Sequence, residues 1–147
     1  MHFKISEEDK TNHRYSGVLA HPTSFPSPYG IGDLGQNAYD FIDFLAASGQ
    51  HLWQVLPLGP TTVGDSPYQS FCVFAGQPLL ISPELLKKKK LLLEEDLAEV
   101  PDFDLDKVEY DKVLLYKTGL FKKAYANFLH TADKNLLEEF DAFCESN

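Results

Sequence analysis

The sequence predicts an α/β fold in which one strand–helix–strand unit is followed by a mainly helical half. Three observations lead to this prediction. Short apolar runs at 16–20 and 52–56 each end at a proline, and an apolar stripe with helical spacing lies between them at 38–45. From residue 83 onward the apolar residues recur at helical spacing. A unit of this kind places its two strands in one sheet with a right-handed crossover.

Residues 1–13 are polar, and we expect them to form a flexible lead-in. The first strand is expected over 16–20, where a His-Pro pair ends it. The loop over 23–32 is rich in Ser, Pro and Gly, which is typical of a structured turn region.

The first helix is predicted to start at Asp33, because Gln36 follows at the spacing of a capping box. Its apolar residues form one stripe, and Gly49 is expected to end it. The stripe consists of Ala38, Phe41, Ile42 and Leu45.

The second strand, 52–56, is mostly apolar, which is typical of a strand buried on both faces, and Trp53 is expected in the core. Pro57 ends it. Functional groups of such folds collect at the carboxyl ends of the strands. Because the loops 22–32 and 57–70 each follow a strand, both are expected on that side of the sheet.

The second half starts with an apolar stretch, 71–81, that carries Gly and Pro and is expected to be a loop. A Ser-Pro pair at 82–83 is typical of a helix start, with Leu85 and Leu86 facing inward. The four lysines at 87–90 suit the end of that helix, where cations complement the helix dipole. The other interpretation of the lysines, a nucleic-acid patch, is disfavoured by the acidic composition of the whole chain.

A short acidic helix is expected over 93–100 and a loop over 101–106. Asp106 with Glu109 suits the start of a longer helix, and 131–133 separate it from a last one. We expect the apolar stripes of both helices to be core. The stripes are Leu114, Phe121, Tyr125 and Phe128, then Leu136, Leu137, Phe140 and Phe143.

Charge and composition restrict the partners. The chain has 13 Lys plus Arg, 22 Asp plus Glu and a formal net charge of −9. This balance argues against nucleic acid and against an anionic membrane. Cys72 and Cys144 lie in no metal-ligand spacing, and the chain has no nucleotide-binding motif, so we expect neither metal nor cofactor. The start has no signal-like core and no apolar run approaches the roughly 20 residues of a membrane span, so we expect a cytoplasmic protein.

The loop over 57–70 is the candidate functional stretch. It mixes turn formers with hydroxyls, a carboxylate, an amide and a phenol. Several short polar groups beside one flat aromatic ring are what a polyol-binding loop needs. Composition alone also allows an ordinary polar surface loop.

Three stretches together resemble one family. They are LWQVLPLGPT with GDSPYQS over 52–70, GVLAHPTS with PYGIGDLG over 17–35, and FAGQPLLI over 74–81. In this order they resemble the amino-terminal region of the 4-alpha-glucanotransferases (amylomaltases, glycoside hydrolase family 77). The resemblance covers roughly residues 14–86.

The resemblance implies a TIM (β/α)8 barrel enzyme that transfers α-1,4-glucan segments between maltooligosaccharides by retaining double displacement, without a cofactor. Residues 14–70 would start the barrel, and 71–147 would be a loop and helical insertion. A complete barrel takes about 250 residues, so only an incomplete barrel fits here and the rest is expected beyond Asn147. The chain would then be a piece of a longer enzyme or a shortened relative.

Retaining transfer needs a nucleophilic carboxylate and a carboxyl acid/base. In the family these belong to later strands, so no catalytic residue is assigned to this chain and it is expected to be inactive alone. The alternative is a non-catalytic glucan-binding or interaction module.

Substrate-binding residues follow from the same motif. Tyr68 matches the family's tyrosine near the cleaved bond, and its ring and hydroxyl suit a pyranose. Ser66 and Gln69 are further candidates. Asp65 has two interpretations, a glucose contact or a bond to the backbone N–H two residues on.

The alternative to helix capping by Asp33 is a sugar contact, and His21, at a strand end, is expected to be structural. Val63 stands where some members carry an aromatic residue of a second glucan site, so that site is not expected. Lys90 and Leu93 stand where members often have a Gly turn and a Ser or Thr cap.

Overall fold

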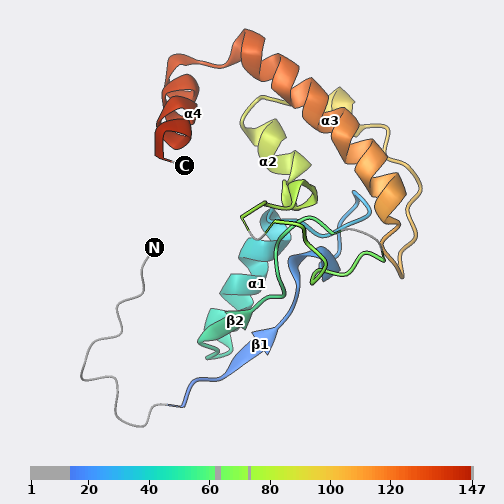
Figure 1. Ribbon diagram of the computed structural model, residues 1–147, viewed down its shortest axis with the longest axis vertical. Helices are drawn as coiled ribbons and strands as arrows, with labels where there is room; N and C mark the ends of the chain where they lie inside the picture. The colour runs from blue at the N-terminus through green and yellow to red at the C-terminus, as the bar shows by residue number, and fades with distance from the viewer. Residues whose placement is uncertain (1–13, 62–63, 73, 147) are drawn as a thin grey trace.

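The computed structural model describes residues 14–61, 64–72 and 74–146. The predicted lead-in, 1–13, and Val63 lie outside this part. In chain order the elements are β1 (Gly17–Leu19), the 3-10 turn η2 (Pro22–Ser24), α1 (Gln36–Ala47), β2 (Leu52–Gln54), η3 (Pro78–Leu80), α2 (Pro83–Lys88), η4 (Glu94–Leu97), α3 (Tyr110–Thr131) and α4 (Lys134–Ser146). Figure 1 shows the strands and α1 at one end, with α3 arching over α2 and α4 beyond it.

The predicted strand–helix–strand unit is confirmed. β1 and β2 are parallel, with Gly17 opposite Leu52 and Leu19 opposite Gln54. Gly17 lets the strands approach, since a Cβ there would lie 2.4 Å from the carbonyl oxygen of Leu52. Trp53, expected in the core, is half-buried, and its Nε1 donates to the carbonyl oxygen of Ala20 at 2.8 Å.

The prediction that the second strand is buried on both faces is wrong for this chain. Leu52 is 55% exposed and Val55 37%. Within the described residues the sheet has two strands. Too few elements therefore surround β2 to cover both of its faces.

The predicted cap of α1 is wrong, although the helix forms nearly where expected. Gly35 is the N-cap and receives no side-chain bond there. Asp33 Oδ1 instead accepts a hydrogen bond of 2.8 Å from the N–H of Gly35, the residue that directly precedes the helix. Gly49 ends the helix as predicted, with φ +70°, and the Gln50 N–H donates to the carbonyl oxygen of Leu45 in a Schellman closure. Of the predicted stripe, Ala38 and Leu45 are buried, Phe41 is half-buried and Ile42 is exposed.

The start of α2 is confirmed, with Ser82 as N-cap and Pro83 first in the helix. Lys87 and Lys88 lie in its last turn, as expected. The acidic helix predicted over 93–100 is reduced to the short turn η4. Lys90 adopts φ +60°, a conformation that favours glycine.

The longer helix is confirmed as α3, but its predicted inward stripe is only partly right, since Phe121 and Phe128 are half-buried. Leu114 is 52% exposed and Tyr125 62%. The buried face is instead Val113, Lys117, Leu120 and Ala124. Leu120 and Ala124 pack in a cluster with Tyr29, and Val113 packs with Ile31 and Leu79. The predicted stripe missed this face because a lysine lies in its middle.

The last helix, α4, forms where predicted, but none of its described residues is buried. Phe140 packs edge-on against Phe128 of α3, with ring centroids 5.3 Å apart.

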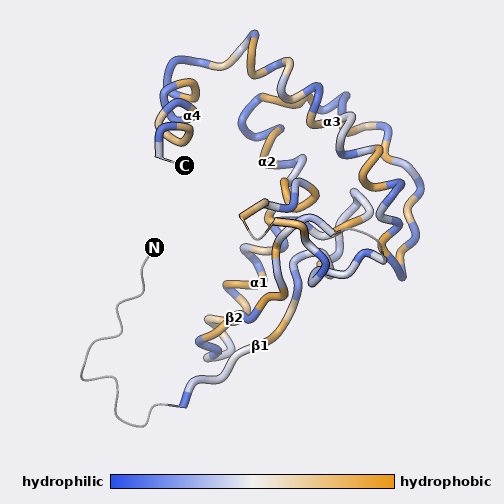
Figure 2. Tube along the Cα trace, viewed as in Figure 1, coloured by the Kyte–Doolittle hydropathy of each residue, from blue (hydrophilic) through white to orange (hydrophobic). Residues whose placement is uncertain are grey.

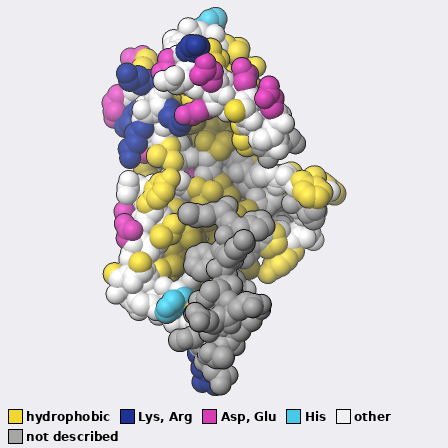
Figure 3. Space-filling view, turned by 90° about the vertical axis from the view of Figure 1, so that its left-hand side faces the viewer, with side chains coloured by type: hydrophobic (Ala, Val, Ile, Leu, Met, Phe, Trp, Pro, Cys, Tyr) yellow, Lys and Arg dark blue, Asp and Glu magenta, His cyan; other side chains and the backbone are white. Residues whose placement is uncertain are grey.

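Figure 2 shows hydrophobic and hydrophilic residues alternating along α3 and α4. In Figure 3 charged side chains gather at the top of the face shown, and hydrophobic ones in its middle. No described helix combines the length and apolar character that a membrane crossing requires.

Candidate functional site

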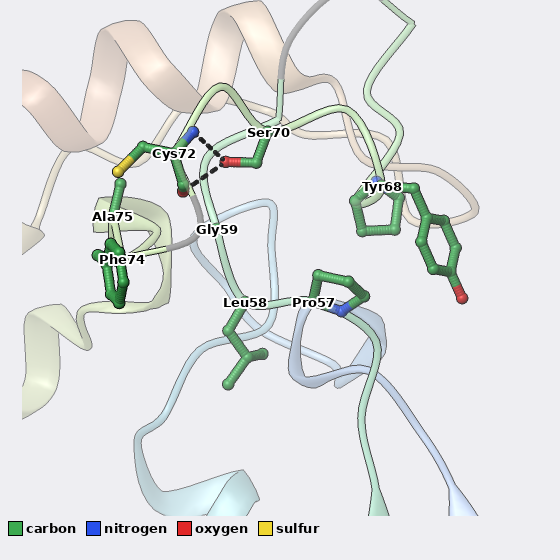
Figure 4. A pocket seen from close by; sticks show the side chains of 10 residues that line it. Pro57, Leu58, Gly59, Tyr68, Ser70, Cys72, Phe74 and Ala75 are labelled. Atoms are coloured by element: carbon green, nitrogen blue, oxygen red, sulfur yellow. Dashed lines mark hydrogen bonds between the residues drawn. The ribbon is translucent and has the colours of Figure 1, made fainter.

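An open pocket of about 380 Å³ lies where the chain leaves β2 (Figure 4). One part of its lining directly follows the strand, and the other comes from the later loop. The lining residues are Pro57, Leu58, Gly59, Pro67, Tyr68, Ser70, Cys72, Phe74, Ala75 and Gly76. The predicted loop 57–70 thus borders a cavity along with part of the stretch that follows it.

A second hollow of about 160 Å³ adjoins the first and shares Pro57, Gly59 and Pro67 with it. Its other walls bring the loop after β1 together with the loop after β2 and with α3. They consist of His21, Thr23, Ser24, Leu56, Thr61, Gln77 and Tyr110. The expectation that both strand-end loops lie on one side of the sheet is therefore confirmed.

Tyr68 lines the larger pocket with a side chain that is largely free, since the residue is 71% exposed. In Figure 4 its ring points away from Ser70 and Cys72, with Phe74 on the other side of the opening. Phe74 is 94% exposed and was not among the predicted site residues. Its position in the FAGQP stretch, which resembles a family motif, was the sequence signal that could have identified it as a site residue. Two aromatic rings therefore border this pocket, and an aromatic ring offers an apolar surface to a sugar ring.

The turn before Tyr68 is closed by Ser66. Its hydroxyl accepts from the Tyr68 N–H at 3.3 Å, and its carbonyl oxygen accepts from the Gln69 N–H at 3.1 Å. The proposed turn at Asp65 is wrong, because residue 67 is a proline and has no N–H to donate. Asp65 itself adopts φ +53°. Asp65, Ser66 and Gln69 do not line either of these hollows.

The floor of the larger pocket is held by Gln77. Its N–H donates to the carbonyl oxygen of Leu58 at 3.0 Å, and its Nε2 donates to that of Gly59 at 3.5 Å. Gly59 lies close to Ser70, since a Cβ at this position would lie 2.8 Å from Ser70 Oγ. The Ser70 hydroxyl donates to the carbonyl oxygen of Cys72 at 3.0 Å and tightens the loop.

His21 has the structural role expected of it. Its Nδ1 lies 2.7 Å from Thr23 Oγ1 and accepts from the Thr23 N–H at 3.4 Å, which caps η2. Nε2 is buried without a hydrogen-bond partner among the described residues. Nearby, burial raises the pKa of Tyr110, and a hydrogen bond with Thr23 opposes that shift.

Carboxylates are absent from the linings of these two hollows. The described residues also include no group of three or more His, Cys, Asp or Glu that could hold a metal ion. The arrangement can therefore bind a neutral polyol through rings, hydroxyls and backbone groups. By itself it has neither the carboxylate nucleophile nor the carboxyl acid/base of retaining glycosyl transfer at these walls.

Comparison with known proteins decides the family. The sequence profile of the 4-alpha-glucanotransferase family matches residues 20–147. The chain belongs to this family. It is 44% identical over 133 residues to the 4-alpha-glucanotransferase of Synechocystis sp., covering 90% of this chain and 26% of that protein. It is 50% identical over 129 residues to the Aquifex aeolicus 4-alpha-glucanotransferase, covering 86% of this chain and 25% of that protein.

The fold agrees with the sequence. The solved structure of the amylomaltase from Streptococcus agalactiae in complex with acarbose superposes with a TM-score of 0.82 at 37% identity. It covers 91% of this chain and 27% of the amylomaltase chain. The predicted membership in the 4-alpha-glucanotransferases is thus confirmed, and the chain spans about a quarter of the length of the relatives it matches.

Proposed function

We propose that this chain is the amino-terminal part of a cytoplasmic 4-alpha-glucanotransferase that transfers α-1,4-glucan segments between maltooligosaccharides. The observation that carries the proposal is the pocket at the end of β2, bordered by Tyr68 and built from the family's own motifs. Its neutral lining suits a neutral glucan.

The reaction is a double displacement that retains configuration at the transferred sugar. A carboxylate attacks the anomeric carbon while a carboxylic acid protonates the departing oxygen, and the acceptor hydroxyl then takes the sugar from the enzyme. Because the two hollows have no carboxylate in their linings, both groups would come from later strands of a (β/α)8 barrel beyond Asn147.

In this proposal residues 14–70 begin the barrel and 71–147 form a loop and helical insertion. The exposure of Leu52 on β2 and of Val55 just after it supports an incomplete barrel, since further strands and helices would cover them. The isolated 147 residues would then be inactive.

Tyr68 would hold the glucan next to the cleaved bond. Its ring is free to pack against a pyranose and its hydroxyl to bond a sugar hydroxyl. Ser66, Asp65 and Gln69 would act from the same turn, Ser66 mainly by fixing the backbone of Tyr68.

A second candidate is a non-catalytic glucan-binding module. The absence of carboxylates from the two hollows favours it for the chain taken alone. The two proposals differ in one respect, since only the first requires turnover by the protein that the source cells make.

The test is the mass and activity of the native protein. We expect a mass well above 16.6 kDa and disproportionation of maltotriose. Tyr68→Ala should then lower kcat/KM by about a hundredfold and Tyr68→Phe by about tenfold. Tyr125→Ala is the control, because Tyr125 is similarly exposed on α3 and lines neither hollow.

A native protein without disproportionation, but with glucan binding that Tyr68→Ala abolishes, would favour the binding module. Equal kinetics for Tyr68→Ala and Tyr125→Ala would exclude Tyr68 from the site.

A further inference from the structure

Lys117 lies in the middle of the buried face of α3 and is 0% exposed. Its neighbours on that face, Val113 and Leu120, are apolar. Burying an ammonium group is costly unless every N–H finds a partner. An apolar side chain of similar length would avoid this cost, so the lysine calls for an explanation beyond packing.

The Lys117 ammonium has three acceptors for its three N–H groups. Nζ lies 2.6 Å from the carbonyl oxygen of Leu79 and 3.0 Å from that of Ile81. It also lies 3.5 Å from Asp33 Oδ2. One side chain thus joins three separate parts of the chain, namely α3, the segment 77–81 and the loop before α1.

The segment 77–81 is the one that holds the pocket floor. It contains η3, and Gln77 at its start bonds the carbonyl oxygens of Leu58 and Gly59. Its other end is fixed to the loop after β1, because the Leu34 N–H donates to the carbonyl oxygen of Leu80 at 2.9 Å. A continuous series of bonds therefore runs from Lys117 to two residues that line the larger pocket.

We propose that Lys117 is a positioning residue for the glucan pocket, acting through the segment 77–81 and Gln77 on the floor formed by Leu58 and Gly59. The ammonium holds two carbonyl oxygens of that segment at a fixed distance from Asp33. The helical half is thereby coupled to the substrate site. That the ligand is a glucan rests on the function proposed above, whereas the mechanical link rests on the hydrogen bonds alone.

The experiment compares four variants of the native protein with the wild type. Lys117→Met removes the ammonium and keeps the length of the side chain. Lys122→Met is the matched control, because Lys122 is exposed on the same helix. Gln77→Ala weakens the other end of the series, because it removes the side-chain bonds to Gly59 and to the Leu79 N–H but keeps the backbone bond to Leu58. The fourth variant combines Lys117→Met with Gln77→Ala.

Amide hydrogen exchange is the first readout. We expect Lys117→Met to speed exchange of the Gln77 amide, which donates to Leu58, by about tenfold or more. The Gln50 amide, which closes α1, should stay within about twofold of the wild type. Lys122→Met should change neither amide. Gln77→Ala keeps the backbone N–H of residue 77, so the exchange of this amide can be measured in that variant even if Lys117→Met does not fold.

Kinetics on maltotriose are the second readout. Lys117→Met and Gln77→Ala should each raise KM by about tenfold with a smaller change in kcat, and the double variant should be no worse than either single one. Additive losses in the double variant, or a lowered Tm with unchanged Gln77 exchange and unchanged KM, would overturn the proposal. If the wild type does not disproportionate maltotriose, the proposed function fails, and the exchange measurement still decides the link.

Discussion

The indole Nε1 of Trp53 donates a hydrogen bond of 2.8 Å to the carbonyl oxygen of Ala20. This bond ties β2 to the end of β1, at the point where both site loops begin. The ring also packs against Phe25 and Phe41, with centroids 5.8 and 5.2 Å away. One side chain therefore fixes the two strand ends on which the pockets depend.

We expect Trp53→Phe to lower the free energy of unfolding of the native protein by about 2–3 kcal/mol. The variant keeps an aromatic ring but leaves the Ala20 carbonyl oxygen unpaired and part of the site empty. Denaturant unfolding measures the change. Tyr39→Phe, at an exposed position of α1, is the control, and equal stability of the two variants would contradict the prediction.

The same substitution should have opposite effects at two glycines. Gly17→Ala would place a Cβ 2.4 Å from the carbonyl oxygen of Leu52 and push the paired strands apart. At Gly119, within α3, no atom of the described residues lies within 4 Å of an added Cβ, apart from the adjacent residues and the helix's own backbone. We expect Gly17→Ala to destabilise by about 2 kcal/mol or more, and Gly119→Ala to stabilise by about 0.5–1 kcal/mol through helix propensity. Thermal unfolding checks both, and a gain in stability at Gly17 would show that the strands tolerate a wider spacing.

Lys90 occupies the position where the family often has a glycine turn, and its φ of +60° is left-handed. That conformation costs a residue with a Cβ about 1–2 kcal/mol. Lys90→Gly should therefore raise the free energy of unfolding by about 1 kcal/mol, whereas Lys88→Gly, at the last residue of α2, should lower it by about 0.5 kcal/mol. The two variants make the same change in charge, so a charge effect would move both in the same direction.

The buried ammonium predicts a pH dependence of stability. Burial lowers the pKa of Lys117 to about 8 from the ordinary value of 10.5, with the nearby Asp33 carboxylate opposing the shift. Between these values the unfolded chain keeps a proton that the folded chain has lost, so stability rises with pH. The neutral amine still has two N–H groups for the carbonyl oxygens of Leu79 and Ile81.

The measurement is the unfolding free energy of the wild type minus that of Lys117→Met, which cancels the titration of the tyrosines. This difference should be flat below pH 8 and should rise by about 2 kcal/mol between pH 8 and 10. A flat difference up to pH 10 would mean that the lysine keeps its proton in the folded protein.

The sequence by itself determined the order of the elements, the parallel strand pair and the family. These follow from local signals, since Gly49 ends α1 whatever packs around it and the motif stretches are contiguous. The strand β2, by contrast, ends at Gln54, before the predicted stop at Pro57. The sequence also identified the loop that borders the pocket and, within it, Tyr68.

Tertiary structure alone decided which face of α3 is buried and what Asp33 does. Helical periodicity gives the spacing of a stripe, but the buried face depends on what lies opposite. Here that includes backbone carbonyl oxygens 36 and 38 residues away, which make a buried lysine tolerable. Asp33 was expected to cap a helix because local spacing favoured it, yet one of its oxygens faces this same ammonium. Such partners are brought together only by the fold, because the free energy that keeps a charge buried comes from groups distant in sequence.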